Sequence, residues 1–482
     1  MNSIPRLNKF FLISIIFGLS SIIGVTSAIQ PLYTILFMAA CIGFIAFVFL
    51  LKDPTKLLLT ATVFLPFTSV ISIIVGGAKL SIPDALIIFL GFILLIRGSF
   101  KANKFNLTRE HKRVIILYVF LLIFSLLFSI LCFYKVKGNI LVLPSWAGSY
   151  NSIVIGSVVA NFRLIVPLIV LVAVPLLIKS EKDFHKILKH FIAGSFIATC
   201  YGLYEFVIKT AGLGFSYLLP GHAQGVLFFG DGKVRLSGTF GEPSYFAGFI
   251  VLSIFICVYA KKLRVLPKFV LNIMILLHLI VLLFTYSTGG YLALLVGTLV
   301  YLFYSGKVKF FVSVYFLALL AIVLVLFVPT VTEVVQKPFD NSTGQMGSST
   351  DRSNTANAAI NMFKDSPIYG IGYGNFSFLY NHYRPATAIY KSDPSIANNV
   401  YADFISSYGL IGLLLLLIIF VQFKRSLKKI RIHTRTEYPF FVGAVFTILV
   451  IYMAYPTFSY AFQWVFYSIL LMRSDLLKKP TV

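Results

Sequence analysis

The sequence predicts an all-α polytopic membrane protein with about fourteen transmembrane helices and one large, partly helical outer loop. Of its 482 residues, 59% are hydrophobic and only 12% are charged. Apolar runs long enough to cross about 30 Å of hydrocarbon recur along the chain. Basic residues collect in every second segment between these runs, as positive-inside topology requires. A soluble chain of this length would divide into several domains, so we expect a single membrane domain instead.

The apolar runs define the expected spans. They cover Phe10–Ala28, Leu32–Leu51, Leu57–Val75, Ile82–Ile96, Val114–Phe133, Ile153–Ile178, Ile187–Ile208, Tyr245–Ala260, Phe269–Tyr286, Tyr291–Tyr304, Val308–Val328, Tyr408–Phe423, Phe440–Tyr455 and Thr457–Met472. Arg6 and Lys9 before the first run, and the small residues at its end, are also typical of a signal peptide. The apolar core is longer than usual for a signal peptide, so an uncleaved first helix is the favoured interpretation.

Lysine and arginine provide a test of this segmentation. Of 41 basic residues, 29 lie in alternate segments. These segments are the N-terminus, Lys52–Lys56, Arg97–Arg113, Lys179–Lys189, Lys261–Lys268, Lys307–Lys309, Lys424–Arg435 and Arg473–Lys479. Cytoplasmic loops carry the excess of positive charge, so we expect both termini to be cytoplasmic.

The remaining composition excludes several classes of function. The net charge of +25 would suggest nucleic acid binding in a soluble protein, but here the charge is explained by topology, so we expect no nucleic acid partner. The cysteines lie inside apolar runs without metal-ligand spacing, at Cys41, Cys132, Cys200 and Cys257. They therefore predict neither a disulfide framework nor a zinc site.

Two long segments are expected on the outer side, Lys209–Ser244 and Thr330–Ala397. The second contains a helix-like stretch, Ser353–Lys364, and is expected to be a partly folded element. The predicted organisation is spans 1 to 11 in residues 1–329, the outer loop in residues 330–397, and spans 12 to 14 in residues 398–482. Transporters usually have short loops on both faces of the membrane, whereas an enzyme with a large external substrate needs a long outer loop of this kind to cover it.

Ionisable groups within or beside a span are costly in hydrocarbon and mark function or a paired structural role. The segmentation yields Asp84, Arg163, Glu205, Glu242 and Asp403. All except Arg163 are expected near the outer boundary, and Arg163 lies in the outer half of its span. A polar site that opens outward is the simplest account.

Structural alternatives exist for several of these residues. Asp84 follows a proline at the start of a span, so it is a good helix cap. Glu205, near a helix end, could merely reach the lipid headgroups. His382, in the sequence Tyr-Asn-His-Tyr-Arg that ends at Arg384, is either a general base or a solvated loop histidine. Arg163 needs a carboxylate, a carbonyl or a water-filled cavity, which favours a place in the site.

Separated motifs on the outer side combine into a recognisable pattern. Asp351-Arg352 precedes a stretch, residues 358–376, that ends in a P-x-x-G-x-G-x-G-x-F turn. Residues 397–401, Ala-Asn-Asn-Val-Tyr, lead to a G-x-x-G at residues 409–412. This order resembles the arginine-containing helix, glycine turn, H-N-x-Y element and G-x-x-G of the O-antigen polymerase and O-antigen ligase superfamily.

Two upstream stretches extend the resemblance. Residues 235–247 are similar to the R…G-T-F-x-E-P-S-x-F-A stretch of polymerase members, and residues 287–291 resemble the short polar turn before the next family helix. The resemblance covers roughly residues 235–412. One departure is Asn398, which stands where ligases usually carry a histidine, and an amide cannot serve as a base. This departure weakens the ligase interpretation, while Glu242-Pro243-Ser244 favours a polymerase.

The resemblance implies a membrane glycosyltransferase of GT-C-like architecture in the bacterial inner membrane. Family members transfer a growing glycan from undecaprenyl diphosphate to an acceptor sugar hydroxyl at the outer face. Arginines suit the diphosphate because they offer paired donors and a fixed charge. Arg163, Arg235 and Arg352 are therefore the expected catalytic arginines, Glu242 is expected to orient the acceptor hydroxyl, and His382 is a further catalytic candidate.

A second set of residues is expected to bind substrate. It consists of Asp84, Glu205, Arg384, Asn398, Asn399, Tyr401 and Asp403. The resemblance implies no metal and no cofactor. The expected partners are the undecaprenyl diphosphate-linked oligosaccharide and the lipid bilayer, with a separate flippase and a chain-length regulator as candidate partner proteins.

Two competing functions remain open from the sequence. A ligase-type transferase would attach a finished glycan to lipid or protein. A flippase for the same lipid-linked sugars could also have about fourteen spans and intramembrane arginines, but its outer loops are expected to be short. The sugars, the linkage and the final polymer, whether O-antigen, capsule, exopolysaccharide or cell-wall polymer, are not encoded in any recognisable motif.

Overall fold

A computed structural model describes residues 52–69, 72–75, 78–97, 109–141, 150–211, 228–229, 233–307, 348–388 and 396–476. The chain forms two compact units, residues 1–57 and 58–482, and the second holds nearly all of the described residues. Three expected spans, Phe10–Ala28, Leu32–Leu51 and Val308–Val328, lie outside the described residues.

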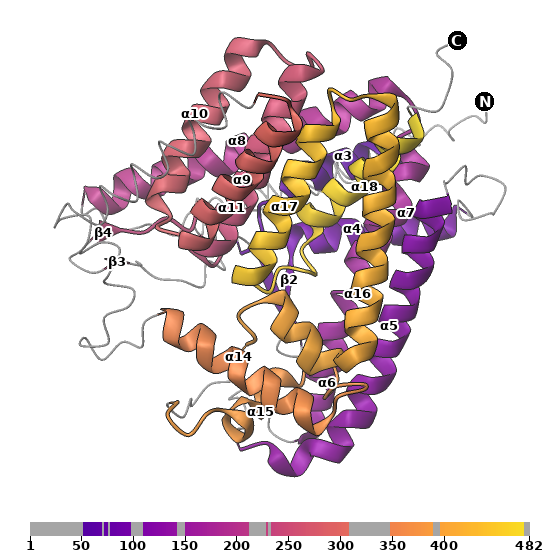
Figure 1. The fold of residues 1–482 in the computed structure, drawn as a ribbon, viewed down its shortest axis with the longest axis vertical. Coiled ribbons are helices and arrows are strands. Elements are labelled where there is room, and N and C mark those ends of the chain that lie inside the picture. The colour runs from indigo at the N-terminus through magenta and orange to yellow at the C-terminus, as the bar shows by residue number, and fades with distance from the viewer. Residues whose placement is uncertain are drawn as a thin grey trace, which may run out of the picture. The chain divides into compact units, whose positions relative to one another are not determined.

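The described residues are mostly helical, as predicted (Figure 1). The helices are α3 (Pro54–Phe64), α4 (Ile82–Ile96), α5 (Arg109–Val136), α6 (Tyr150–Phe162), α7 (Ile165–Leu177), α8 (Glu181–Thr210), α9 (Pro243–Lys262), α10 (Lys268–Phe284), α11 (Thr288–Tyr304), α14 (Ser348–Asp365), α15 (Phe376–Tyr383), α16 (Val400–His433), α17 (Tyr438–Ala454) and α18 (Ala461–Leu476), with a 3₁₀ turn at Lys137–Asn139. N-cap residues, such as Ser81 before α4 and Asn399 before α16, mark the positions where polar segments end and apolar helices begin.

Two short antiparallel hairpins depart from the all-helical expectation. Strands β1 (Ser72–Val75) and β2 (Ala78–Ser81) pair with Ser72 opposite Ser81, and β3 (Phe228–Phe229) pairs with β4 (Lys233–Val234). As a result, the expected span Leu57–Val75 is not one continuous helix. Helix α3 ends at Phe64, and Pro66, which lacks an amide hydrogen, follows before the chain turns into β1.

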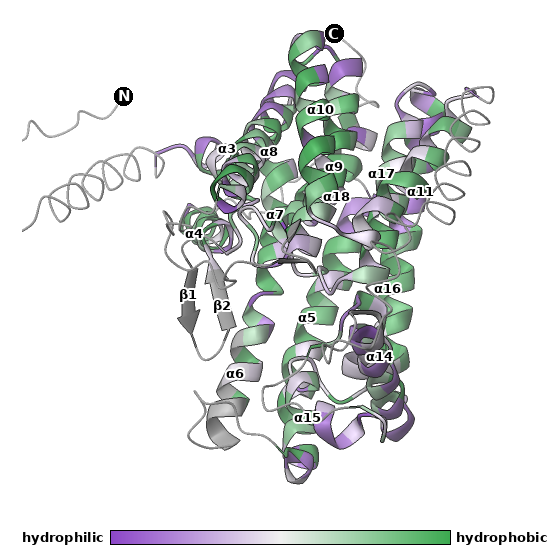
Figure 2. Ribbon diagram, turned by 90° about the vertical axis from the view of Figure 1, so that its left-hand side faces the viewer, coloured by the Kyte–Doolittle hydropathy of each residue, from purple (hydrophilic) through white to green (hydrophobic). Residues whose placement is uncertain are grey.

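Apolar helices of spanning length support a membrane location. Among the described residues, five helical stretches are long and apolar enough to cross a bilayer: Arg109–Asn139, Gly156–Leu177, Glu181–Thr210, Pro243–Lys262 and Val400–His433. Shorter apolar helices, α4, α10, α11 and α17, accompany them. Figure 2 shows hydrophobic residues along α5, α9, α10 and α16, in contrast to the hydrophilic α14. The total of fourteen spans stays a prediction.

Helix α5 is longer than a bilayer core requires. Its 28 residues extend about 42 Å at 1.5 Å per residue, against about 30 Å of hydrocarbon. At its C-terminal end, Phe133 and Ile140 are buried in one apolar cluster with residues of α14 and α15, including Met362 and Leu379. Helices α14 and α15 therefore form a cap beside the C-terminal end of α5 and the N-terminal end of α16, as Figure 1 shows.

A break in α16 joins this cap to the membrane helix. Gly409 has φ 60° and ψ −149°, so the helix is interrupted there. The glycine-rich turn fills the interruption, because Ile371 and Gly372 donate backbone hydrogen bonds to the carbonyls of Ser406 (2.8 Å) and Ser407 (3.1 Å). Carbonyls of the same turn accept from residues 410 and 411. We refer to this joint between residues 367–374 and 406–411 as the glycine clasp.

The glycines of the clasp allow its close backbone contacts. A Cβ at Gly409 would lie 2.6 Å from the Pro367 carbonyl oxygen, and one at Gly372 (φ 83°) would lie 2.7 Å from Ser129 Cα. Left-handed backbone is costly for other residues, so the P-x-x-G-x-G-x-G turn is explained by packing. Asn375 then fixes the turn to α5 and α6, by donating to the Ser129 carbonyl at 3.1 Å and accepting from Ser157 at 3.0 Å.

We expect Gly409→Ala to destabilise the folded protein by roughly 3 kcal/mol, because backbone strain of about 1–2 kcal/mol adds to overpacking. The matched control is Gly306→Ala. Gly306 also has a positive φ, 73°, but a Cβ there would meet nothing within 4 Å, so only the strain remains. Thermal unfolding of the purified proteins measures the difference. Equal stability of the two variants would show that the clasp is not closely packed.

Candidate functional site

The candidate site begins at a helix break around Arg163. The expected span Ile153–Ile178 is divided into α6 and α7, with Arg163 and Leu164 in the turn between them. Pro167 explains the break, since a proline ring clashes with the carbonyl four residues earlier, which belongs to Arg163. The break places a guanidinium among polar groups in the interior of the helix assembly.

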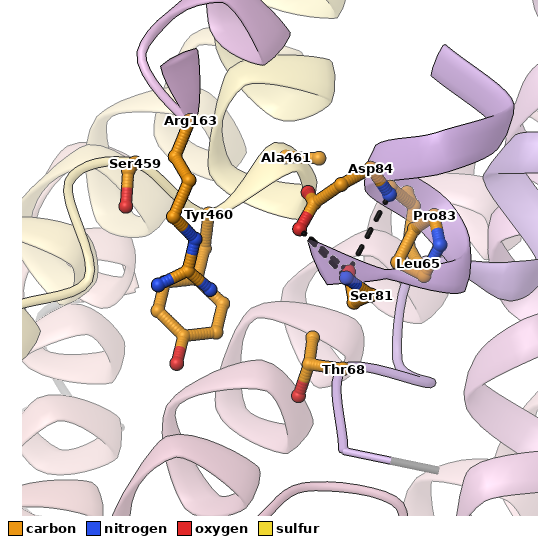
Figure 3. A pocket seen from close by; sticks show the side chains of 9 residues that line it. All are labelled: Leu65, Thr68, Ser81, Pro83, Asp84, Arg163, Ser459, Tyr460 and Ala461. Atoms are coloured by element: carbon orange, nitrogen blue, oxygen red, sulfur yellow. Dashed lines mark hydrogen bonds between the residues drawn. The ribbon is translucent and has the colours of Figure 1, made fainter. Parts of the chain in front are cut away.

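Arg163 lines a small cavity together with Asp84 and Tyr460 (Figure 3). Asp84 and Ser81 form a capping box at the start of α4: the Ser81 hydroxyl donates to Asp84 Oδ2 at 2.7 Å, and the Asp84 amide donates to Ser81 Oγ. The capping interpretation of Asp84 is therefore confirmed. The same carboxylate also faces the cavity that Arg163 enters, so capping and an electrostatic role coexist.

A second, larger cavity of about 210 Å³ shares Arg163, Ser459 and Tyr460 with the first. Its polar lining includes Arg163, Tyr245, Tyr373, Ser377, Asp403, Ser459 and Tyr460. Asp403, in the first turn of α16, accepts a hydrogen bond from Ser407 at 3.2 Å. The Tyr460 hydroxyl can donate to an anionic or sugar oxygen in this cavity.

Besides the two cavities, the structure contains a charged group made of Arg235, Glu242, Arg352 and Tyr455. The Arg352 guanidinium lies 5.5 Å from the centre of the Tyr455 ring, and Tyr455 also hydrogen-bonds to Ser287. Arg235 donates to the Thr285 carbonyl at 3.0 Å. Burial lowers the pKa of Arg235, while the nearby Glu242 carboxylate opposes that shift. An arginine remains charged under such conditions, so this group concentrates positive charge around one carboxylate.

Glu242 precedes α9 at the N-cap position, yet its side chain makes no capping hydrogen bond. It accepts a hydrogen bond from Ser244 at 3.1 Å instead. The Glu242 carboxylate therefore does not cap α9.

Two tyrosines connect these groups into one region. Tyr245 interacts electrostatically with Tyr460, Glu242, Arg163 and Tyr455, and Tyr460 interacts with Arg163, Asp84 and Glu242. The structure therefore brings Arg163, Arg235, Arg352 and Glu242 together with Asp84 and Asp403. We call this set, with its tyrosines, the arginine–tyrosine site.

Several tyrosines of the site were missed by the sequence analysis. They are Tyr245, Tyr373, Tyr455 and Tyr460. A signal for two of them existed in Pro456, which separates the expected spans Phe440–Tyr455 and Thr457–Met472 and stands among the polar residues Thr457, Ser459 and Tyr460. Aromatic residues are so frequent in this chain, at 16%, that composition alone could not select these four.

Glu205 has a structural position. It is fully buried, pairs with Lys209 at 2.6 Å, and accepts backbone hydrogen bonds from Ser237 (3.2 Å) and Gly238 (2.7 Å). It does not reach lipid headgroups, since no part of it is exposed. Its carboxylate holds the segment that follows Arg235, and it does not line either cavity of the site.

The Asn398–Tyr401 segment also makes structural contacts. Asn398 donates to Asp351 (3.0 Å) and Thr355 (3.3 Å) on α14, which places Arg352 beside Tyr455. Asn399 caps α16 by accepting from the Ala402 amide at 2.6 Å. Tyr401 donates to the Leu449 carbonyl of α17 at 3.2 Å.

His382 and Arg384 lie apart from the two cavities. His382 is exposed on α15, and its ring packs edge-on against Tyr383 at 4.8 Å. Arg384 donates to the Ala388 carbonyl. The expected catalytic role of His382 and substrate role of Arg384 gain no support from this placement. Among the described residues, no three His, Cys, Asp or Glu side chains cluster in a way that could hold a metal ion, and we assign none to a metal.

Comparison with known proteins agrees with the motifs. A family model described as O-antigen ligase matches residues 273–417, from within α10 to the middle of α16. The match contains Arg352, the glycine clasp and Asp403, whereas Arg163, Arg235 and Glu242 lie outside it. No curated protein matches the chain. The match confirms the resemblance of this membrane protein to the O-antigen ligase and polymerase superfamily.

Proposed function

We propose that the protein is a polysaccharide polymerase that transfers a growing glycan from undecaprenyl diphosphate to a sugar hydroxyl of another lipid-linked repeat unit. The observation that carries the proposal is the convergence of Arg163, Arg235 and Arg352 on a region that also holds Glu242. The family match supports an enzyme of the ligase or polymerase type. The proposed location is the outer face of the bacterial inner membrane, with both termini cytoplasmic.

The arginines suit the charge that develops during transfer. The acceptor oxygen forms a bond to the anomeric carbon of the donor glycan, and the bond from that carbon to the diphosphate oxygen breaks. Undecaprenyl diphosphate leaves with the electron pair. Fixed guanidinium groups stabilise this charge without reorganisation during the step. Arg352 and Arg235 flank Tyr455, so two charges can contact one diphosphate.

A carboxylate must receive the proton of the attacking hydroxyl. Glu242 is our candidate because it lies among the arginines and does not cap α9. Asp403 is the second candidate, since it lines the 210 Å³ cavity with Arg163. Tyr245, Tyr373 and Tyr460 offer aromatic faces and hydroxyl donors in that cavity, both of which suit a sugar ring.

A ligase-type transfer is the alternative, favoured by the description of the matching family. Against it, Asn398 stands where ligases usually carry a histidine, and its amide is engaged by Asp351 and Thr355. A flippase would need no convergence of a carboxylate and arginines on one site, to which α14 contributes Arg352.

The proposal predicts that the purified protein alone converts a lipid-linked repeat unit into a ladder of products that differ by one unit. The reaction is followed by gel electrophoresis of the labelled glycan. A ligase would give a single transfer to an added lipid acceptor and no ladder, and a flippase would leave the repeat unit unchanged. Either of these results would contradict the polymerase assignment.

A further inference from the structure

A groove unrelated to the arginine–tyrosine site lies between α5 and α16. The two helices pack side by side in opposite directions. Near the start of α5 and the end of α16, they leave a groove of about 540 Å³. Its lining includes Arg113, Gln422 and Arg425, together with aliphatic residues such as Ile116, Ile418 and Val421. Pockets of roughly 300–1,000 Å³ commonly hold ligands.

The lining changes from charged to apolar along the helix axes. At the helix ends, Lys429 of α16 forms an ion pair with Glu110 of α5. One turn further in are Arg113 and Arg425, and the next turn carries Ile116 and Val421, both exposed. A phospholipid has the same gradient, with a charged head followed by hydrocarbon.

The two arginines have no carboxylate partner among the described residues. Arg425 donates to the neutral Gln422 amide oxygen at 3.3 Å, and Arg113 forms no ion pair in the described part of the chain. The neighbouring Glu110 is already bound by Lys429. Guanidinium groups beside hydrocarbon call for an anion, and a phosphate accepts their paired donors well.

We propose that this groove binds one anionic diacyl phospholipid of the leaflet at this end of the helices. Its phosphate contacts Arg113 and Arg425, and an acyl chain lies along Ile116, Ile418 and Val421. Charge complementarity selects an anionic headgroup over a zwitterionic one. The bound lipid stabilises the pairing of α5 with α16, the helices on which the cap of α14 and α15 rests. The inference is independent of the proposed catalytic function.

The test is native mass spectrometry of the full chain in neutral detergent with added phosphatidylglycerol or phosphatidylcholine. We expect phosphatidylglycerol to bind at least about tenfold more tightly, and Arg113→Gln/Arg425→Gln to lose that preference, since losing charged hydrogen bonds of about 1.4 kcal/mol changes affinity tenfold. Lys112→Gln/Lys428→Gln is the matched control. It removes two charges from exposed positions on the same helices that do not line the groove.

A second variant keeps the arginines and fills the apolar part. Val421 is 37% exposed, so Val421→Trp should fold and should also reduce phosphatidylglycerol binding about tenfold by blocking the acyl chain. Equal binding of the two lipids by the wild type would overturn the proposal. So would the finding that Arg113→Gln/Arg425→Gln and Val421→Trp both bind phosphatidylglycerol as tightly as the wild type does. The proposal would also fail if the wild type were a dimer with no bound lipid and Val421→Trp were a monomer. That result would show that a second copy of the chain occupies the groove.

Discussion

Replacing Arg352 by alanine should abolish polymer formation. If the guanidinium stabilises the leaving diphosphate, its loss should lower the transfer rate about 10²- to 10³-fold, the usual effect of removing one preorganised donor. Arg352→Lys should recover only part of the activity, because an ammonium supplies charge without the paired donors. The ladder assay with the purified protein measures both effects.

Lys364→Ala is the control for this prediction. Lys364 lies on the same helix, α14, but is exposed and near the other end, so its removal tests whether any loss of charge on α14 is enough. We expect a normal ladder from this variant. Full activity of a well-folded Arg352→Ala protein would reduce Arg352 to a structural partner of Tyr455.

Changing Glu242 to glutamine should leave a folded protein that binds the lipid-linked substrate but does not join it. The amide preserves volume while losing charge and basicity, and general base catalysis typically contributes 10²- to 10⁴-fold. The single repeat unit should accumulate on the outer face, which can be measured by labelling its sugars in intact cells. Because the carboxylate makes no capping hydrogen bond, thermal stability should change by less than about 1 kcal/mol.

Asp403→Asn provides the matched comparison, since it removes the carboxylate of the arginine–tyrosine site that lines the 210 Å³ cavity. If Asp403 is the base, its variant will show the larger loss and Glu242→Gln will give near-normal ladders. Accumulation of the repeat unit on the inner face would instead indicate a flippase.

The helices could be predicted from the sequence because their length and apolar composition are local properties. Expected spans such as Val114–Phe133 and Phe440–Tyr455 correspond to α5 and α17. The breaks were harder to predict. Pro66 and Pro167 are visible in the sequence, but whether a proline ends a helix or only bends it depends on which neighbouring groups satisfy the freed backbone.

The polar residues show the same division. The cost of a charge in hydrocarbon selected Arg163 and Glu242 from the sequence, and the structure brings them together. It also selected Glu205, which is buried against the backbone of Ser237 and Gly238. The cost of placing a charge in hydrocarbon marks a residue as paired or functional. It does not show which partner the charged group has in the folded protein.

The sequence by itself predicted a largely helical membrane protein that resembles the O-antigen ligase and polymerase superfamily, with a set of arginines as candidates for its chemistry. Hydropathy, charge alternation and motif order are properties of the chain alone. The tertiary structure decided that the glycine turn is a clasp across the break at Gly409. It also decided that tyrosines far apart in sequence surround the arginines, because contacts between residues such as Tyr245 and Tyr460 depend on how the helices pack.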